Sequence, residues 1–171
     1  MALENSHLPL PFEELMRRHE REIMRYLLRV TGHREDAADL FQETFIRAYR
    51  AYPRINPDGN LRSWLYTIAT NLCRNRARDS ARRSRVIVQS SDDPPPDALG
   101  KSHCSPHEDA GYAAVRMREL VSGLPAKQRQ SIHLRYFAGF EYAEIAAAMG
   151  CSEESARANV SQAMRKLKAT W

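Results

Sequence analysis

The chain has 171 residues and a net charge of +5, from 26 Lys and Arg side chains against 21 Asp and Glu. This length fits one domain or two small ones. Residues 1–91 sum to +5, residues 92–111 to −4 and residues 112–171 to +4. Two basic blocks that flank an acidic one indicate a polyanionic partner, most commonly nucleic acid. The longest stretch without a charged residue, Ser63–Cys73, is far shorter than the roughly 20 apolar residues of a transmembrane helix, so we expect no membrane insertion.

The N-terminus and the cysteines exclude further classes. Met1–Pro11 has no basic head followed by an apolar core, which argues against a secretory signal and predicts a cytoplasmic protein. The three cysteines are odd in number and far apart, which suits neither a disulfide framework nor a paired thiolate site: Cys73, Cys104 and Cys151. A structural zinc site at His103, Cys104 and His107 would lack a fourth ligand. We therefore expect reduced thiols, no metal and no cofactor.

Apolar residues spaced by three and four predict three helices in the N-terminal block. The first has its apolar face at Phe12, Leu15, Met16, His19, Ile23, Tyr26, Leu27 and Val30, and ends at Thr31 and Gly32. The second starts near Arg34 or Glu35, stops before Pro53, and turns Ala37, Phe41, Thr44, Phe45, Ala48 and Tyr49 inward. The third is capped by Asn60 and buries Leu61, Trp64, Leu65, Ile68, Ala69 and Leu72. Together they predict a compact helical bundle.

Beyond Arg78 the apolar spacing fades, and Ser90–Pro106 collects acidic residues, serines and three consecutive prolines. That composition is typical of a linker. Helical spacing returns near Glu108, with Leu124 before Pro125 at a first helical position and with Ile132, Tyr136 and Phe137 inward. No strand candidate is convincing. The sequence thus predicts an all-α protein of two small helical domains, residues 1–85 and 111–171, joined by a flexible acidic Pro-rich linker over residues 86–110.

The C-terminal block carries a helix-turn-helix pattern. Gly150 suits the left-handed residue that ends one helix, and Ser152 suits the cap of the next, with Glu153 in its first turn. The second helix buries Ala156, Val160, Met164 and Leu167, and its opposite face offers Arg157, Ala158, Ser161, Gln162 and Arg165. We call these five residues the recognition face, because such a polar face fits the major groove of DNA. The alternative is an ordinary helical hairpin with a solvated face.

The second predicted helix carries an acidic stripe, which we define as Asp36, Asp39, Gln42 and Glu43. Spacings of three and four place these side chains on one side of the helix, away from the apolar face. The stripe would repel DNA and would suit docking of a basic protein partner. A solvated face, with acids placed favourably at a helix start, explains the same charges.

The third predicted helix presents amide, aromatic and guanidinium groups outward. They suit unpaired bases, which need stacking platforms, edge readers and backbone neutralisers. We call the set the single-strand face: Arg62, Tyr66, Thr67, Asn71, Arg74, Asn75 and Arg78, with Trp64 near its start. Six arginines fall within residues 74–85. Alternatively, Trp64 and Tyr66 are partly core residues and the arginines only aid solubility.

In their order and spacing these motifs resemble the extracytoplasmic-function (ECF) sigma factors, the minimal form of the sigma-70 family of bacterial transcription initiation factors. The resemblance spans nearly the whole chain. It rests on Asp36–Phe45 (DAADLFQETF), on Trp64–Ala69 (WLYTIA) with Asn71, on Leu124-Pro125, and on Tyr142–Ala146 (YAEIA) leading to Gly150 and Ser152. Glu141, where relatives often have Ser or Thr, and Ala158, Asn159 and Gln162 on the recognition helix depart from the family pattern. These departures leave the promoter sequence open.

The resemblance implies a non-enzymatic factor that binds RNA polymerase core. Its acidic stripe would dock on the clamp helices of the largest subunit, with the flap region as a further contact. The turn with Asn56, Asp58 and Asn60 would hold a base flipped from the minus-ten promoter element, and the single-strand face would read or support the opened strand. The helix after Ser152 would lie in the major groove of the minus-thirty-five element. Family members are usually held inactive by an anti-sigma factor, so we expect one here.

Two other functions fit parts of the sequence. A stand-alone helix-turn-helix regulator would bind duplex DNA without polymerase, its N-terminal bundle sensing a ligand or dimerising. A nuclease would need clustered carboxylates for metal ions, which Asp36, Asp39 and Glu43 could supply. Those carboxylates lie away from the arginines, which argues against the nuclease.

Overall fold

The structure is a computed structural model that describes residues 11–56, 59–88 and 112–170. Every regular element in these ranges is helical. The N-terminal domain comprises α1 (Phe12–Thr31), α2 (Arg34–Ala51), the short turn η1 (Tyr52–Arg54) and α3 (Leu61–Val88). The C-terminal domain comprises α4 (Tyr112–Ser122), α5 (Ala126–Ile132), η2 (His133–Phe137), α6 (Tyr142–Met149) and α7 (Glu153–Thr170). The all-α prediction is confirmed. None of the helices in these ranges is both long and apolar enough to cross a bilayer.

The predicted helix ends are set by local chemistry. Gly32 follows α1 with φ of 76°, a left-handed conformation that glycine adopts without strain. The Asn60 side chain accepts a hydrogen bond of 2.9 Å from the Ser63 backbone N–H, as its predicted capping role requires. Pro125 lies one position before α5 rather than inside it. The third helix continues past Arg78 to Val88, further than the apolar spacing indicated.

The N-terminal core forms where α1, α2 and α3 meet, as predicted. Leu15, Ile23, Leu27, Leu65 and Ala69 are fully buried in it. The Tyr26 hydroxyl, also buried, makes a 2.8 Å hydrogen bond with the Thr70 hydroxyl. Each of these two buried hydroxyl groups therefore has a hydrogen-bond partner inside the core.

The inward prediction for Tyr49 is wrong. Its side chain is 62% exposed and meets the Phe12 ring edge to face at 5.3 Å, while Leu40 takes the buried place on α2. Ala48 in the same turn is fully buried, so Tyr49 lies just beyond the edge of the buried face of α2.

The helix-turn-helix has the predicted turn. Gly150 adopts φ of 58°, and the Ser152 hydroxyl accepts a 3.1 Å hydrogen bond from the Ser155 backbone N–H at the start of α7. Glu141, the departure from the family pattern, forms a reciprocal capping box with Glu144 at the start of α6. A glutamate therefore serves here in the capping role of a hydroxyl side chain.

The segment before α6 differs from its prediction. Residues His133–Phe137 form a π-helical turn, in which hydrogen bonds span five residues instead of the four of an α-helix, as in the 3.0 Å bond from the Ala138 N–H to the His133 carbonyl. The turn rotates Tyr136 and Phe137 out of the core, and they are 59% and 53% exposed. Their predicted inward positions assumed continuous α-helical spacing, and are wrong for this reason.

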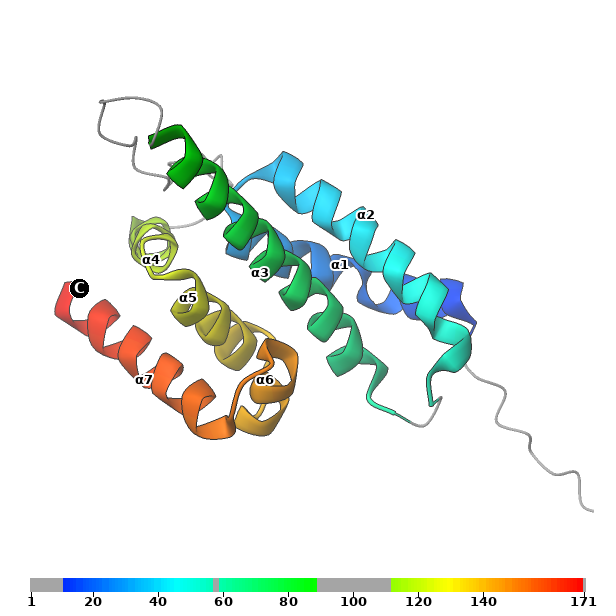
Figure 1. The fold of residues 1–171 in the computed structure, drawn as a ribbon. Coiled ribbons are helices and arrows are strands. Elements are labelled where there is room, and N and C mark those ends of the chain that lie inside the picture. Colours follow the sequence, from blue (N-terminus) through cyan, green and yellow to red (C-terminus); the bar gives the residue numbers. More distant parts are fainter. Residues whose placement is uncertain (1–10, 57–58, 89–111, 171) are drawn as a thin grey trace, which may run out of the picture.

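The two domains pack against each other. In Figure 1, α3 crosses the middle of the molecule with α1 and α2 on one side and α5 and α6 on the other. One hydrophobic cluster spans the contact, joining Leu65 and Tyr66 of α3 to Phe140, Ile145 and Met149. A second, smaller cluster holds α4, α5 and α7 together. We call this contact the closed arrangement.

Candidate nucleic-acid and protein interfaces

The recognition face lies open on α7. All five of its residues are exposed, together with Ser152 and Glu153 at the helix start. The opposite side of α7 is buried through Ala156, Val160, Ala163 and Leu167. The helix thus presents a polar side to solvent along its length, which is the geometry that a major groove accepts.

Two residues of the recognition face have partners inside the domain. The Arg157 guanidinium donates to the Glu153 carboxylate at 2.9 Å and lies 4.4 Å from the centroid of the Tyr142 ring. The Gln162 side chain accepts a 3.0 Å hydrogen bond from the Gln128 amide. Such partners limit the rotamers of Arg157 and Gln162, so these side chains have less entropy to lose when a ligand binds this face.

The acidic stripe is on the surface of α2, but arginines partly neutralise it. The Arg76 guanidinium from α3 pairs with Asp36 and lies 3.6 Å from Asp39. Glu43 pairs with Arg47 one turn along α2 at 2.5 Å. Asp39 remains 70% exposed despite its partner. The stripe therefore has accessible carboxylates whose arginine partners a basic protein segment could replace.

The prediction that the carboxylates of the stripe lie away from the arginines is wrong, because Arg76 of α3 pairs with Asp36 and lies 3.6 Å from Asp39. The same geometry bears on the nuclease alternative. The carboxylates of the stripe are directed to arginines, and no group of three or more His, Cys, Asp and Glu side chains in the described ranges is arranged to hold a metal ion.

Cys73 and Cys151 are free thiols, and burial raises the pKa of the Cys73 thiol to about 12. His103, Cys104, His107 and the predicted linker lie outside the described residues.

The single-strand face is continuous only along part of α3. Asn71, Asn75 and Arg78 are exposed on successive turns. The Asn75 side chain accepts a 2.7 Å hydrogen bond from Arg78, and Asn71 lies 3.4 Å from Arg74. These residues form an accessible row of amides and guanidinium groups, which is the chemistry predicted for contact with unpaired bases.

At the start of α3 the prediction of exposure fails. Tyr66 is 3% exposed, with its ring 5.1 Å from Tyr26 and 4.9 Å from Phe140 of the C-terminal domain. Burial, assisted by the Glu22 carboxylate, raises the pKa of Tyr66 to about 12. Trp64 is half-buried against the same cluster. In the closed arrangement Tyr66 is a core residue and cannot stack on a base.

Three other predicted promoter contacts are used to hold the C-terminal domain. Arg62 donates to the Ala138 carbonyl at 2.8 Å and pairs with Glu22 at 3.0 Å. Arg74 donates to the Met149 carbonyl, and the Asn60 amide donates to Glu144 at 3.1 Å. Sequence reasoning missed this shared use, because neither local spacing nor charge identifies a partner more than 70 residues away.

Three further residues were predicted to contact minus-ten DNA. Asn56 is exposed in the turn before α3, and Thr67 is half-buried with its hydroxyl donating to the Ser63 carbonyl. Asp58 lies outside the described residues.

Comparisons with known proteins agree with the division into two parts. Residues 15–83 match the family model for Sigma-70 region 2, and residues 114–167 match that for Sigma-70, region 4. The chain is 30% identical over 156 residues to the ECF RNA polymerase sigma factor SigL of Mycobacterium tuberculosis, covering 89% of this chain and 84% of that protein. It is 28% identical over 166 residues to the ECF RNA polymerase sigma factor SigE of Mycolicibacterium smegmatis, covering 92% of this chain but only 60% of that longer protein.

A solved structure has the same fold. The sigma factor RpoE from Bartonella quintana, crystallised in complex with the anti-sigma factor NepR, superposes with a TM-score of 0.71 at 24% sequence identity. The match covers 92% of this chain and 94% of that one. Both domains are therefore included in the structural likeness.

Proposed function

Because the chain belongs to the sigma-70 family, as an ECF sigma factor that functions in transcription initiation, we propose that it directs RNA polymerase core to promoters through the three surfaces described above. The recognition face of α7 reads the minus-thirty-five duplex. The exposed row on α3 holds unpaired minus-ten bases. The acidic stripe of α2 docks on polymerase. Sigma factors are not enzymes, and capture of bases requires no covalent step.

The exposed amides of α3 carry the minus-ten proposal. Flipping a base out of duplex DNA costs a few kcal/mol. A protein that binds the extruded base shifts the equilibrium towards the open duplex without further energy input. Asn71 and Asn75 offer donors and acceptors for base edges, while Arg78 offers charge for the backbone.

The closed arrangement is not the promoter-bound state in this proposal. Asn60, Arg62 and Arg74 cannot contact DNA while they donate to Glu144, Ala138 and Met149 of the C-terminal domain. The domains must separate for the single-strand face to be complete. With residues 86–110 proposed as the tether, one bound element then raises the effective concentration at the other.

Docking of the acidic stripe has a direct test. Replacing Asp39 and Glu43 by Arg adds like charges beside Arg76 and Arg47, and should abolish binding to polymerase core while leaving the fold intact, since both side chains lie on the surface. Binding is measured by gel filtration with purified core. Arg17→Glu and Arg18→Glu reverse two exposed charges on α1 and serve as the matched control. Retained core binding by the stripe variant would contradict the docking assignment.

The whole proposal is tested by run-off transcription with core enzyme and a promoter library. We expect transcripts from promoters that carry two elements at one fixed spacing, because the two domains are held on one chain. Changing the spacer by several base pairs should abolish the transcript. A protein that bound duplex DNA tightly without core would instead fit a stand-alone regulator.

An anti-sigma factor is a further expected partner. The support is the likeness to RpoE, which was crystallised with NepR. An inhibitor that stabilises the closed arrangement would keep Asn60, Arg62 and Arg74 engaged with the C-terminal domain. Co-purification followed by loss of run-off transcription would test it.

A further inference from the structure

One side chain of the recognition face, Arg157, is held by contacts with two different helices. Its guanidinium donates to the Glu153 carboxylate at 2.9 Å and lies over the Tyr142 ring, 4.4 Å from the ring centroid. Glu153 is the first residue of α7, whereas Tyr142 is the first residue of α6. The two contacts therefore tie Arg157 both to its own helix and to the other helix of the helix-turn-helix.

Tyr142 is itself anchored. It is half-buried, and it packs against both the cluster that joins the domains and the cluster that holds α4, α5 and α7 together. A second guanidinium, from Arg135, lies 4.8 Å from the same ring centroid. Arg135 in turn donates to the Phe140 carbonyl at 2.8 Å and pairs with the Glu141 carboxylate at 3.0 Å. These contacts limit how far the ring can move away from Arg157.

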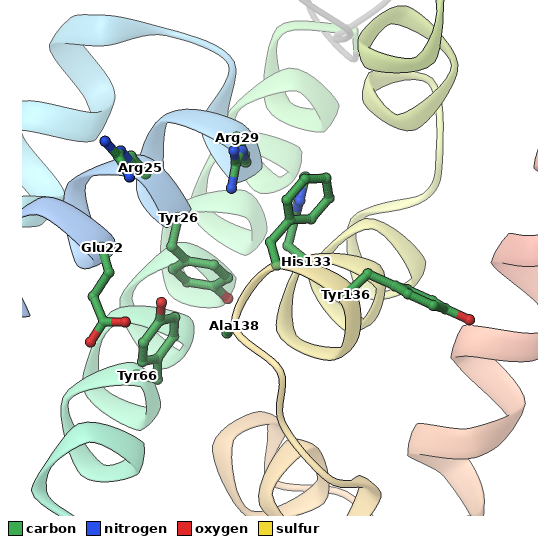
Figure 2. Close-up of a pocket in the computed structure, with 9 residues that line it drawn as sticks. Glu22, Arg25, Tyr26, Arg29, Tyr66, His133, Tyr136 and Ala138 are labelled. Carbon is green, nitrogen blue, oxygen red and sulfur yellow. The ribbon is translucent and has the colours of Figure 1, made fainter. Parts of the chain in front are cut away.

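The side chains of the π-helical turn leave it in different directions. In Figure 2, His133 points towards α1, whereas Tyr136 points away from it. Arg135, one residue before Tyr136, forms its bonds within the C-terminal domain. The Tyr136 ring is 59% exposed, and no guanidinium of the described residues lies over it. Tyr136 is therefore a tyrosine of the same domain that lacks the contacts of Tyr142.

A guanidinium held in this way suits the reading of a base edge. The aromatic ring attracts the cation without using its N–H groups, and Glu153 accepts from one of them. The remaining donors are available to a base, and the commonest specific contact joins an arginine to the O6 and N7 acceptors of guanine. A guanidinium in a fixed position satisfies only a base whose acceptors lie opposite its donors, while a mobile one can turn to other bases or to phosphates.

We propose that Tyr142 is a positioning residue that sets the base specificity of Arg157 in the minus-thirty-five duplex. The inference rests on the proposed reading of this duplex by the recognition face, and it adds a residue that lies outside that face. Apolar spacing could not assign this role, because Tyr142 belongs to α6 and packs on the core clusters. Loss of the ring should lower discrimination between bases more than overall affinity, since the charge of Arg157 remains.

The test uses the full chain with polymerase core and a promoter library randomised over the minus-thirty-five element. Sequencing of the bound promoters gives the base preference at each position. Arg157→Ala identifies the position that Arg157 reads, because the preference there should disappear. In Tyr142→Leu, which removes the ring and keeps an apolar side chain, the preference at this one position should fall by about two- to fivefold. Tyr142→Phe keeps the ring and should retain the preference of the parent.

The control variants separate positioning from support of the fold. Tyr136→Leu makes the same substitution at an exposed tyrosine and should leave every preference unchanged. Tyr142→Leu combined with Arg157→Ala should behave as Arg157→Ala alone, because the ring acts through Arg157. Far-UV circular dichroism establishes that each variant is folded. Tyr142→Met, which also lacks the ring, replaces Tyr142→Leu if that variant is not folded.

Three results would overturn the proposal: an unchanged preference in Tyr142→Leu, an equal loss at every position of the element, or a loss in Tyr142→Phe as large as in Tyr142→Leu. The second result would make Tyr142 a support of the domain alone, and the third would assign the effect to its hydroxyl group. If Arg157→Ala changed no preference, the proposed reading of the duplex by Arg157 would itself be wrong. That outcome is distinct from a Tyr142 variant that keeps a preference which Arg157→Ala removes.

Discussion

The two faces that we propose contact DNA differ in how far other parts of the chain cover them. The recognition face of α7 is exposed from Arg157 to Arg165, and its partners lie within its own domain. The single-strand face of α3 is divided: Asn71, Asn75 and Arg78 are exposed, while Tyr66 is covered by the other domain. The face that we propose for duplex DNA is accessible as it stands. The other becomes complete only when the domains separate.

Replacing Phe140 should have the largest effect on how far the C-terminal domain covers the single-strand face. Its ring is 1% exposed and packs on Tyr66 at 4.9 Å, with the Arg62 guanidinium 4.9 Å from the ring centroid. Phe140→Ala should cost about 3–5 kcal/mol of stability, from lost burial and the cavity left behind. Urea denaturation measures the loss, and binding of single-stranded minus-ten DNA should rise because Tyr66 is uncovered.

The matched control is Tyr49→Ala, an exposed aromatic on α2 with one ring contact to Phe12. It should cost about 1 kcal/mol or less and leave single-strand binding unchanged. If Phe140→Ala lost stability without gaining single-strand affinity, the domain contact would not be what masks α3.

His133 should make the closed arrangement sensitive to acid. Its pKa is about 4 in the folded chain against an ordinary value of 6.5. Between these values the unfolded chain binds the proton and the folded chain does not, so stability is full above pH 6.5 and falls as the pH drops towards 4. The loss attributable to His133 approaches about 3 kcal/mol.

The measurement is the difference in unfolding free energy between the parent and His133→Gln across pH 4–7. The difference should change over this range, because the variant has no imidazole to protonate, while carboxylates titrate in both proteins. His33→Gln, at an exposed position before α2, is the control. Parallel pH profiles for the parent and His133→Gln would contradict the assignment.

The recognition face offers the next largest effect. Arg157→Ala should weaken minus-thirty-five binding by about 1–3 kcal/mol if the guanidinium reads a base edge. A fluorescence anisotropy titration with duplex DNA measures it, and the loss should shrink on a duplex altered at the contacted base. Arg116→Ala removes an exposed arginine of α4 that pairs with Glu119, and should leave affinity unchanged. A uniform loss on every duplex would make Arg157 a phosphate contact instead.

Sequence patterns predicted most of the helices, several of their ends and the exposed recognition face, because these depend on local chemistry. The Asn60 and Ser152 caps and the left-handed Gly32 and Gly150 are examples in which one side chain or its absence determines the backbone. The acidic stripe was also found on the surface, where helical spacing placed it.

What spacing could not reveal depends on contacts between distant residues. Tyr66 lies next to the core residue Leu65 on α3, and its burial depends on contacts with Tyr26 of α1 and Phe140 of the C-terminal domain, both distant in the sequence. Tyr136 and Phe137 were assigned to the core because a π-helical turn has no signature in apolar spacing.

Asn71 should give the smallest but most selective effect. Its amide is exposed one turn before Asn75, and its oxygen lies 3.4 Å from Arg74, the residue that donates to the Met149 carbonyl of the C-terminal domain. Asn71→Ala should make the free energy of minus-ten melting less favourable by about 0.5–1.5 kcal/mol, which is the net contribution of one hydrogen bond to a base edge. Melting is followed with a fluorescent base in the minus-ten element, using polymerase core and the parent chain as reference. Binding of the minus-thirty-five duplex, measured on the same protein, should not change, because α7 does not use this residue. An equal loss in both assays would mean that Asn71 supports the fold of α3. The single-strand face and the recognition face would then not be shown to contact separate parts of the promoter.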